Sequence, residues 1–532
     1  MHSVGASTDR HIRAAGDDEV VPCSAAGRRA VLAAAILGSG MAFIDGTVAN
    51  VALPAIQRDL GASAFQAQWV IESYALVLAA LLLVGGALGD RFGRRRVFAI
   101  GTALFAVASA GCGLAASVHG LIAARALQGV GAALMVPGSL ALISAVFPRQ
   151  ERGRAIGTWS GASAITAAVG PVLGGWLIDH ASWTWAFFIN LPFAALVLWL
   201  CWRHVPESRR PQAGRLDIIG AVLATLGLAG IVFAFIEAPA THWLAPPVVV
   251  AAAVGVLATV GFFVQESRSP APMLPLAMLR IRNFAGANLL TLLLYAGLSG
   301  GLYFFPLALI QVQGASATLA GAALLPFALI LTLFSNAAGR LADRVGPRLM
   351  LVTGPLIAAV GFALFALPGV GADYWRGYLP AVVVLGIGMT ITVAPLTATV
   401  MNAAGPESAG VASGVNNAVS RVAGVLAIAV FGLVMALVFD ARLRADLQTL
   451  AVPPEAARAL YEQRHQLAAA QPPAGLPPEQ AQALRDAVRD AFIAGFRWVM
   501  GVSAGLALLS ALAAWRWIGR GDLAGAESGR RP

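Results

Sequence analysis

Three ionisable side chains interrupt otherwise apolar stretches of the sequence. Asp45 lies in FIDGTVANVALP, Glu72 in WVIESYAL and Arg125 in LIAARALQGVGAA. A charge inside a lipid-spanning segment is costly and usually faces a partner or an aqueous cavity. Burial raises the proton affinity of an acid and a nearby arginine lowers it, so such a cluster could take up and release a proton. A purely structural role for Asp45, bonded to a neighbouring helix, is the alternative.

The depths of these residues favour one shared site. With a helical rise of about 1.5 Å per residue, Asp45 lies about nine residues below the outer end of its stretch, and Glu72 and Arg125 about six. All three are therefore expected within roughly one helical turn of the same level. Two alternatives stay open: Arg125 could extend its side chain to the surface, and Glu72 could lie near the surface in contact with water.

The elements that hold these residues are membrane-spanning helices. The 532 residues are 58% hydrophobic and only 12% charged, with a mean hydropathy of +0.76, whereas a soluble protein carries about twice that charge. The apolar runs are continuous over about 20 residues, which favours helices over the alternating strands of a barrel. Fourteen spans are expected, near 30–51, 67–88, 97–117, 120–146, 157–178, 184–204, 216–237, 244–264, 284–308, 320–338, 349–368, 377–400, 412–439 and 492–515.

The basic residues predict the orientation and exclude several classes of protein. Arginines concentrate in the loops and tails of one side, while the short loops of the other side hold only Arg58 and Arg376. Both tails, 1–28 and 521–532, are therefore expected in the cytoplasm, and the net charge of +10 reflects this asymmetry, not nucleic-acid binding. Without any lysine the chain has no phosphate-binding P-loop. Three separate cysteines and scattered histidines predict neither a disulfide framework nor a metal site.

A charged turn occurs twice. GALGDRFGRRR, residues 86–96, has a near copy in GRLADRVGPRL, residues 339–349. Both fall between the second and third spans of a six-span unit, which predicts two halves, 29–210 and 271–520, with two inserted helices in 211–270. Such repeats build transporters whose substrate site lies between the halves. Gly86 and Gly93 permit a tight turn, and Asp90 can face a helix N-terminus. A generic basic loop is the alternative.

The turn resembles the loop signature of the major facilitator superfamily, and the chain as a whole resembles the fourteen-helix drug:proton antiporter branch over about residues 28–520. The matching residues are Gly86, Leu88, Asp90, Arg91, Gly93, Arg94 and Arg95. The second copy keeps Gly339, Leu341, Asp343, Arg344 and Gly346, but Pro347 replaces the usual arginine. The resemblance implies that this turn, with Asp90 and Asp343, acts as a cytoplasmic latch between the halves.

Three further segments carry the same resemblance. FIDGTVANVALP is similar to the branch's first-helix signature, which implies that Asp45 couples transport to protons. Arg125, Gln128, Gly129 and Gly131 match the motif whose buried arginine is linked to proton transfer. AVGPVLGGW, in the fifth span, resembles the antiporter signature, although Thr166 replaces one glycine. Its proline favours a kink and its glycines permit close helix packing; the matching residues are Gly157, Gly170, Pro171, Gly174 and Gly175.

These observations predict a non-enzymatic exporter that expels a small amphipathic compound by alternating access, with the proton gradient as its only energy source. Substrate pockets are mostly apolar and aromatic, and the expected contacts are Phe43, Trp69, Tyr74, Gln128, Asn416 and Asn417, although helix packing explains the asparagines equally well. A proton-coupled exporter or permease for an endogenous metabolite is the alternative. Residues 440–491, with three proline pairs, are expected to form an external helical hairpin. The expected location is the cell (inner) membrane, with an adaptor protein as a partner only in a host with two membranes.

Overall fold

A computed structural model of the chain describes residues 23–209, 217–239, 241, 243–270, 272–404 and 409–519. Within these ranges all regular elements are helices, and fourteen of them are long and apolar enough to cross a membrane. The all-α membrane fold and its number of spans are thereby confirmed. Of the expected tails, only residues 23–28 fall inside the described ranges. The terms inner and outer below follow the arginine distribution, with the two charged turns on the inner side.

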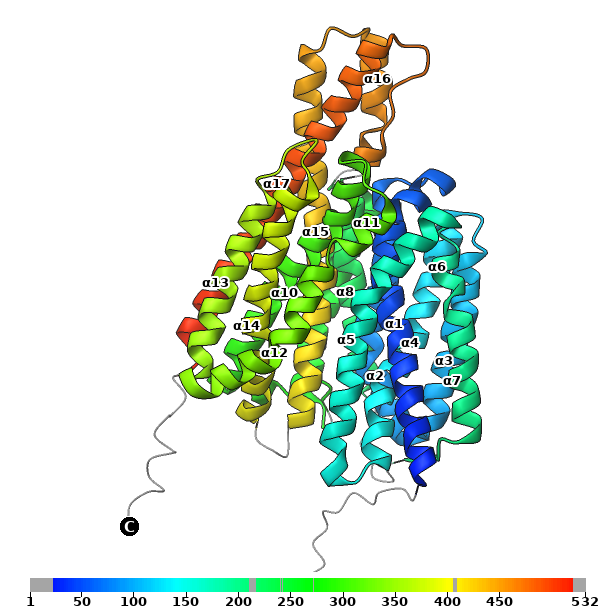
Figure 1. The fold of residues 1–532 in the computed structure, drawn as a ribbon, viewed down its shortest axis with the longest axis vertical. Coiled ribbons are helices and arrows are strands. Elements are labelled where there is room, and N and C mark those ends of the chain that lie inside the picture. The colour runs from blue at the N-terminus through cyan, green and yellow to red at the C-terminus, as the bar shows by residue number, and fades with distance from the viewer. Residues whose placement is uncertain are drawn as a thin grey trace, which may run out of the picture.

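The first six spans form one bundle, blue to cyan-green in Figure 1. Its helices are α1 (Ala25–Leu60), α2 (Ala64–Phe92), α3 (Arg94–Gly113), α4 (Val118–Val146), α5 (Arg149–His180), α6 (Trp185–Phe188) and α7 (Asn190–Arg203). Here α4 packs against α2 and α3, and α1 packs against α5. The start of α2 is fixed by a capping box, because the Ser63 hydroxyl accepts the Gln66 N–H (3.1 Å) and the Gln66 side chain accepts the Ser63 N–H (3.0 Å).

The next two spans are the inserted pair, α8 (Ile218–Glu237) and α9 (Pro246–Arg268), which pack against each other. α8 also packs against α2 and α15 (Ala409–Thr449), so the pair contacts both bundles. The Trp69 indole of α2 donates a hydrogen bond to Glu237 of α8 (3.1 Å) and contacts Phe233. Trp69 therefore fastens the inserted pair to the first bundle.

The last six spans form the second bundle beside the first (Figure 1). After η1 (Leu276–Arg280), its helices are α10 (Arg282–Leu307) with η2 (Ala308–Val312), α11 (Ala317–Ala322) and α12 (Leu325–Val345), α13 (Pro347–Phe365), η3 (Tyr374–Tyr378) with α14 (Leu379–Ala404), α15 and α17 (Pro478–Trp517). α10 packs against α15 and α17, and α13 against α14.

Residues 440–491 project beyond the bundles, at the end opposite to the start of α1 (Figure 1). The projection consists of the outer ends of α15 and α17 with α16 (Pro454–Glu462) and η4 (Arg464–Ala469) between them. Asp440 of α15 accepts hydrogen bonds from Arg444 (3.0 Å) and from the Tyr461 hydroxyl of α16 (2.7 Å). The segment is thus helical, as the sequence predicted, but it continues two membrane spans instead of standing as a separate hairpin.

Both charged turns adopt the same backbone conformation. Gly93 (φ 111°, ψ 124°) and Gly346 (φ 85°, ψ 147°) end α2 and α12, and each donates its N–H to the carbonyl four residues earlier. Positive φ of this kind suits glycine, because it has no Cβ. Pro347 follows directly as the first residue of α13, where a missing N–H costs nothing. The departure of Pro347 from the usual arginine is therefore compatible with the turn.

Around the first turn, Asp90 lies beside the start of α3 but does not cap it with a hydrogen bond. Its carboxylate accepts hydrogen bonds from the Arg94 guanidinium (2.8 Å), which also donates to the Ala141 carbonyl of α4 (3.3 Å). The acid at the N-terminus of α3 is Glu207, which follows α7 and accepts the N–H groups of Arg95 (3.0 Å) and Arg96 (3.2 Å). These contacts hold the inner ends of α2, α3 and α4 together within the first bundle.

The glycines expected in the fifth span pack α5 against both bundles. A Cβ on Gly174 would lie 2.6 Å from Val48 of α1, and a Cβ on Gly175 would overlap the Ala317 carbonyl of α11. Close by, the Asp179 carboxylate accepts the N–H groups of Ala317 (3.0 Å) and Thr318 (2.8 Å) and so caps α11. Gly157 has open space around it in this conformation. The outer end of α5 thus closes the seam between the bundles.

Gly175→Leu should open that seam. The leucine cannot fit against the Ala317 backbone, so the outer-closed conformation is destabilised relative to an outer-open one. We expect an impermeant maleimide, added from outside, to label a Gln57→Cys reporter at least severalfold faster in this variant. Gly157→Leu is the matched control and should leave labelling unchanged. Equal labelling in both variants would contradict a closing role for Gly175.

Glu207→Gln should weaken the start of α3. Loss of the carboxylate at a helix N-terminus costs about 1 kcal/mol, so the purified protein should unfold at a lower temperature, measured by intrinsic fluorescence. Asp486→Asn is the control, because Asp486 lies beyond the first turn of α17, where it forms a solvent-accessible 3.6 Å pair with Arg489, and such pairs contribute little. An equal change in both variants would show that Glu207 is not a specific cap.

Candidate functional site

A central cavity of about 400 Å³ lies between the two bundles. The first bundle supplies Thr47 and Asn50 of α1, Tyr74 of α2 and Arg125 of α4 among its polar lining residues. The second supplies Ser299 and Tyr303 of α10 and Ser420 and Arg421 of α15. The remaining walls are largely apolar. A cavity with a few convergent polar groups between two repeats is where a transporter of this architecture binds its substrate.

Asp45 and Arg125 form a buried ion pair in the wall of this cavity. Arg125 Nη1 donates to Asp45 Oδ2, and the two side chains are fully buried. Arg125 also donates from Nε to the Val70 carbonyl of α2 (3.0 Å) and from Nη1 to Gln128 Oε1 (2.8 Å). Because a buried charge is costly without a partner, this geometry fixes α1 against α4. The Arg125 side chain therefore does not extend to the surface, which was the alternative that the sequence left open.

Further hydrogen bonds surround the carboxylate. Asp45 Oδ1 accepts from Gln128 Nε2 (2.8 Å) and from Asn190 Nδ2 of α7 (3.3 Å). Both amides also donate to Ser109 Oγ of α3, which in turn donates to the Phe187 carbonyl (2.9 Å). Side chains from four helices, α1, α3, α4 and α7, thus form one polar network at the Asp45 carboxylate, and carbonyls of α2 and α6 accept hydrogen bonds from it.

Tyr74 connects this network to the cavity. The Arg125 guanidinium lies over its ring, 4.3 Å from the centroid, and its hydroxyl donates to the Ala42 carbonyl of α1 (3.2 Å). A cation over an aromatic face is a favourable contact. Of the side chains expected to contact substrate, Tyr74 is the one that lines the cavity.

Glu72 does not join the Asp45–Arg125 pair, and it is not solvated either. Its side chain is fully buried, and neither carboxylate oxygen has a hydrogen-bond partner among the described residues. It lies near enough to Tyr303 of α10 for the two groups to interact electrostatically. The expected three-member cluster is therefore a pair, with a separate buried acid at the seam between the bundles.

The other expected substrate contacts have different surroundings. Gln128 belongs to the network of Asp45, Trp69 holds the inserted pair, and Phe43 is absent from the cavity lining. Asn416 donates to Asn288 (3.1 Å) and to Thr291 (2.7 Å) of α10, which is the helix-packing role left open above. Asn417 is exposed, also outside the cavity.

Sequence reasoning missed Asn190 and the cavity residues Thr47 and Asn50. Each is a polar residue in an apolar run, and Thr47 and Asn50 lie two and five positions after Asp45. Such spacing alone does not tell which face of the helix meets the cavity. Arg421 also interrupts an apolar span, and it lines the cavity on the second bundle.

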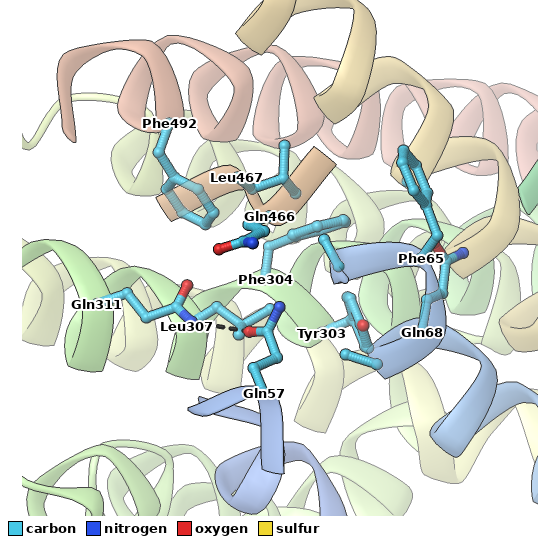
Figure 2. Close-up of a pocket in the computed structure, with 13 residues that line it drawn as sticks. Gln57, Phe65, Gln68, Tyr303, Phe304, Leu307, Gln311, Gln466, Leu467 and Phe492 are labelled. Carbon is cyan, nitrogen blue, oxygen red and sulfur yellow. Dashed lines mark hydrogen bonds between the residues drawn. The ribbon is translucent and has the colours of Figure 1, made fainter. Parts of the chain in front are cut away.

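On its outer side the central cavity is sealed. Figure 2 shows a second, very small cavity there, with Gln57 of α1, Gln311 of η2 and Gln466 of η4 around it. Gln311 donates to Gln57 across the seam (2.8 Å), and Gln68 of α2 donates to the Ile428 carbonyl of α15 (2.9 Å). The space of about 20 Å³ is the size of one water molecule.

The expected latch residues lie away from the cavity, at the inner ends of the helices. Arg91 and Arg344 are exposed, Gly86 is partly buried against Pro137, and the Asp343 side chain lies outside the described part of the structure. Among the described residues, the hydrogen bonds between the two bundles all lie on the outer side. The same residues contain no group of histidine, cysteine or acidic side chains that could hold a metal ion.

Comparison with known proteins places this geometry in a family. The family model described as "Major Facilitator Superfamily" matches residues 35–428. The "Tetracenomycin C resistance and export protein" of Streptomyces glaucescens is 36% identical over 492 residues, which cover 91% of this chain and 90% of the relative. The "Multidrug resistance protein Stp" of Mycobacterium tuberculosis is 34% identical and covers 91% of both chains. The "Puromycin resistance protein pur8" of Streptomyces alboniger is 40% identical over 74% of this chain and 78% of its own.

Solved structures share the fold at low sequence identity. A bacterial homologue of the human lysosomal transporter Spinster, in an inward-facing and unoccupied conformation, superposes with a TM-score of 0.63 at 20% identity and covers 92% of this chain and 98% of its own. The inward-open xylose transporter XylE from E. coli has a TM-score of 0.57 at 15% identity, covering 93% and 97%. With two six-span bundles around a central cavity and a family match over most of its length, this chain belongs to the major facilitator superfamily, among relatives that are drug and antibiotic resistance exporters.

Proposed function

We propose that this protein is a proton-coupled antiporter that exports small amphipathic compounds by alternating access. The observation that carries the proposal is the buried Asp45–Arg125 pair in the wall of a central cavity that is sealed on its outer side. Asp45 itself is buried, but its partner Arg125 lines the cavity, so a change in the proton state of Asp45 would alter the charge of the cavity wall. The relatives named for tetracenomycin C, puromycin and multidrug resistance support export of antibiotics or similar compounds.

Asp45 is the proposed proton carrier. When its carboxylate is ionised, it neutralises Arg125 and accepts from Gln128 and Asn190. A proton on Asp45 would remove the negative charge and leave the Arg125 cation without compensation inside the membrane, which is costly. Protonation therefore favours a different arrangement of α1 and α4, and this is the two-state element that antiport needs.

α1 can transmit that change to the outer seam. Ile44, Thr47 and Val48 neighbour Asp45 in sequence and contact the glycines of α5, whose outer end closes against α11. A shift of α1 would therefore alter the packing of α5 and the closure that depends on it. Coupling of this kind is reciprocal, so substrate must displace protons as strongly as protons displace substrate.

The remaining features of the proposal follow from the arginine distribution. Both termini would lie in the cytoplasm, and the protein would reside in the cell (inner) membrane. The proton gradient would be its only energy source, without a cofactor. In a host with two membranes, an adaptor protein could contact the projecting segment 440–491.

Transport in reconstituted vesicles tests the function. An imposed pH gradient should drive uphill movement of at least one of tetracenomycin C, puromycin and methylenomycin A, the compounds named for the relatives. Purified protein should release protons when that compound is added. Movement of none of them, together with gradient-driven movement of a cellular metabolite, would favour the metabolite exporter instead.

Asp45→Asn should abolish uphill transport while leaving downhill exchange. Asparagine imitates the protonated side chain and cannot release a proton, so we expect gradient-driven uptake at the level of empty vesicles and no substrate-induced proton release. Glu72→Gln is the control, with a weaker expected effect, because Glu72, unlike Asp45, does not pair with Arg125. If Asp45→Asn releases protons as the wild type does, and Glu72→Gln does not, Glu72 is the carrier and the assignment of Asp45 is wrong.

A further inference from the structure

We propose that Arg421 forms an anion-binding subsite in the central cavity, which selects amphipathic compounds that carry a carboxylate or a similar acidic group. The inference rests on the proposed function, because it names the substrate class of the same cavity. It concerns the part of the cavity wall that the second bundle supplies, on α15.

Arg421 is a cation without a protein counter-charge. It lies in the middle of a membrane span and lines the cavity, and its side chain forms no hydrogen bond or ion pair within the described ranges. Its electrostatic neighbour there is the hydroxyl of Tyr74, not an acid. Arg125, in contrast, is neutralised by Asp45. The cavity wall therefore carries one positive charge in excess, because Glu72 does not line the cavity and contacts neither arginine.

The chemistry of this wall fits an acidic group. A guanidinium presents paired N–H donors that match a carboxylate, and within a membrane an uncompensated charge gains strongly from a partner. The hydroxyl of Ser299 lines the same cavity and can donate to the second oxygen, whereas the Ser420 hydroxyl donates to the Asn417 carbonyl (2.8 Å). Apolar side chains on α10 and α15, Leu298, Leu302, Val425 and Ile428, supply a surface for the body of an aromatic ligand.

Two dyes with the same ring system but opposite charge test the subsite. Fluorescein is an anion and rhodamine 123 a cation, and both are built on a xanthene ring. Binding to the purified full-length protein is measured by fluorescence anisotropy. Fluorescein should bind more tightly than rhodamine 123, and Arg421→Gln should weaken fluorescein binding at least about tenfold, as expected for a lost charge-assisted hydrogen bond.

Two control variants separate this effect from general changes. Arg421→Lys keeps the charge and should retain most of the fluorescein affinity. Arg489→Gln removes one positive charge in the projecting part of α17, where Arg489 pairs with Asp486 at 3.6 Å, and should change neither dye. In wild-type protein, benzoate should displace fluorescein while benzylamine should not, a measurement that holds even if Arg421→Gln does not fold.

The outcomes distinguish the subsite from the transport function. Tighter binding of rhodamine 123 by the wild type, equal fluorescein affinity in Arg421→Gln and wild type, or equal competition by benzoate and benzylamine overturns the subsite. If fluorescein binding depends on Arg421 but a pH gradient moves no compound in vesicles, the subsite stands and antiport fails. If the gradient moves rhodamine 123 and binding shows no preference for the anion, antiport stands and the subsite fails.

Discussion

A charge buried in a membrane requires a partner, and the Asp45–Arg125 pair is where this requirement shapes the first bundle. Neither side chain is exposed, so each charge is compensated by the other and by neighbouring dipoles. Those dipoles come from the Val70 carbonyl of α2 and from Gln128 and Asn190. Because the pair and these partners lie on four different helices, α1, α2, α4 and α7, a shift of any one of them leaves a polar group unsatisfied. The pair thus fixes the positions of these helices relative to one another.

The same requirement links chemistry to shape through α1. One face of this helix presents Asp45 to α4, and another presents Val48 to Gly174 of α5. Gly175, the next residue of α5, meets the Ala317 backbone of α11 in the other bundle. Glycines in direct contact leave no flexible side chains to absorb a displacement. If Asp45 changes its charge as we propose, these contacts would transmit the resulting shift of α1 to the outer seam.

Much of this could be predicted from the sequence, because it depends on local signals. Apolar runs of membrane length gave fourteen spans, and a repeated turn with glycine at a positive φ marked two equivalent bundles. Asp45 and Arg125 stood out as charges in apolar runs at similar depth. Local signals do not reveal the partner of a polar residue when that partner lies far away in the sequence. Glu207 caps α3 from 112 positions away, and Glu237 binds Trp69 from 168 positions away.

The two arginines of the cavity show why residue type alone was insufficient. Arg125 and Arg421 both interrupt apolar spans, and neither local sequence reveals an acid for it. Asp45, 80 positions before Arg125, reaches one of them across the bundle, while no acid of the described residues reaches the other. The bundles therefore contribute unequal chemistry: in the first, Asp45 neutralises Arg125, and in the second, Arg421 has no acidic partner among the described residues. A ligand that spans the cavity would contact both bundles, so the proposed proton exchange at Asp45 and the proposed anion preference at Arg421 would act on the same molecule.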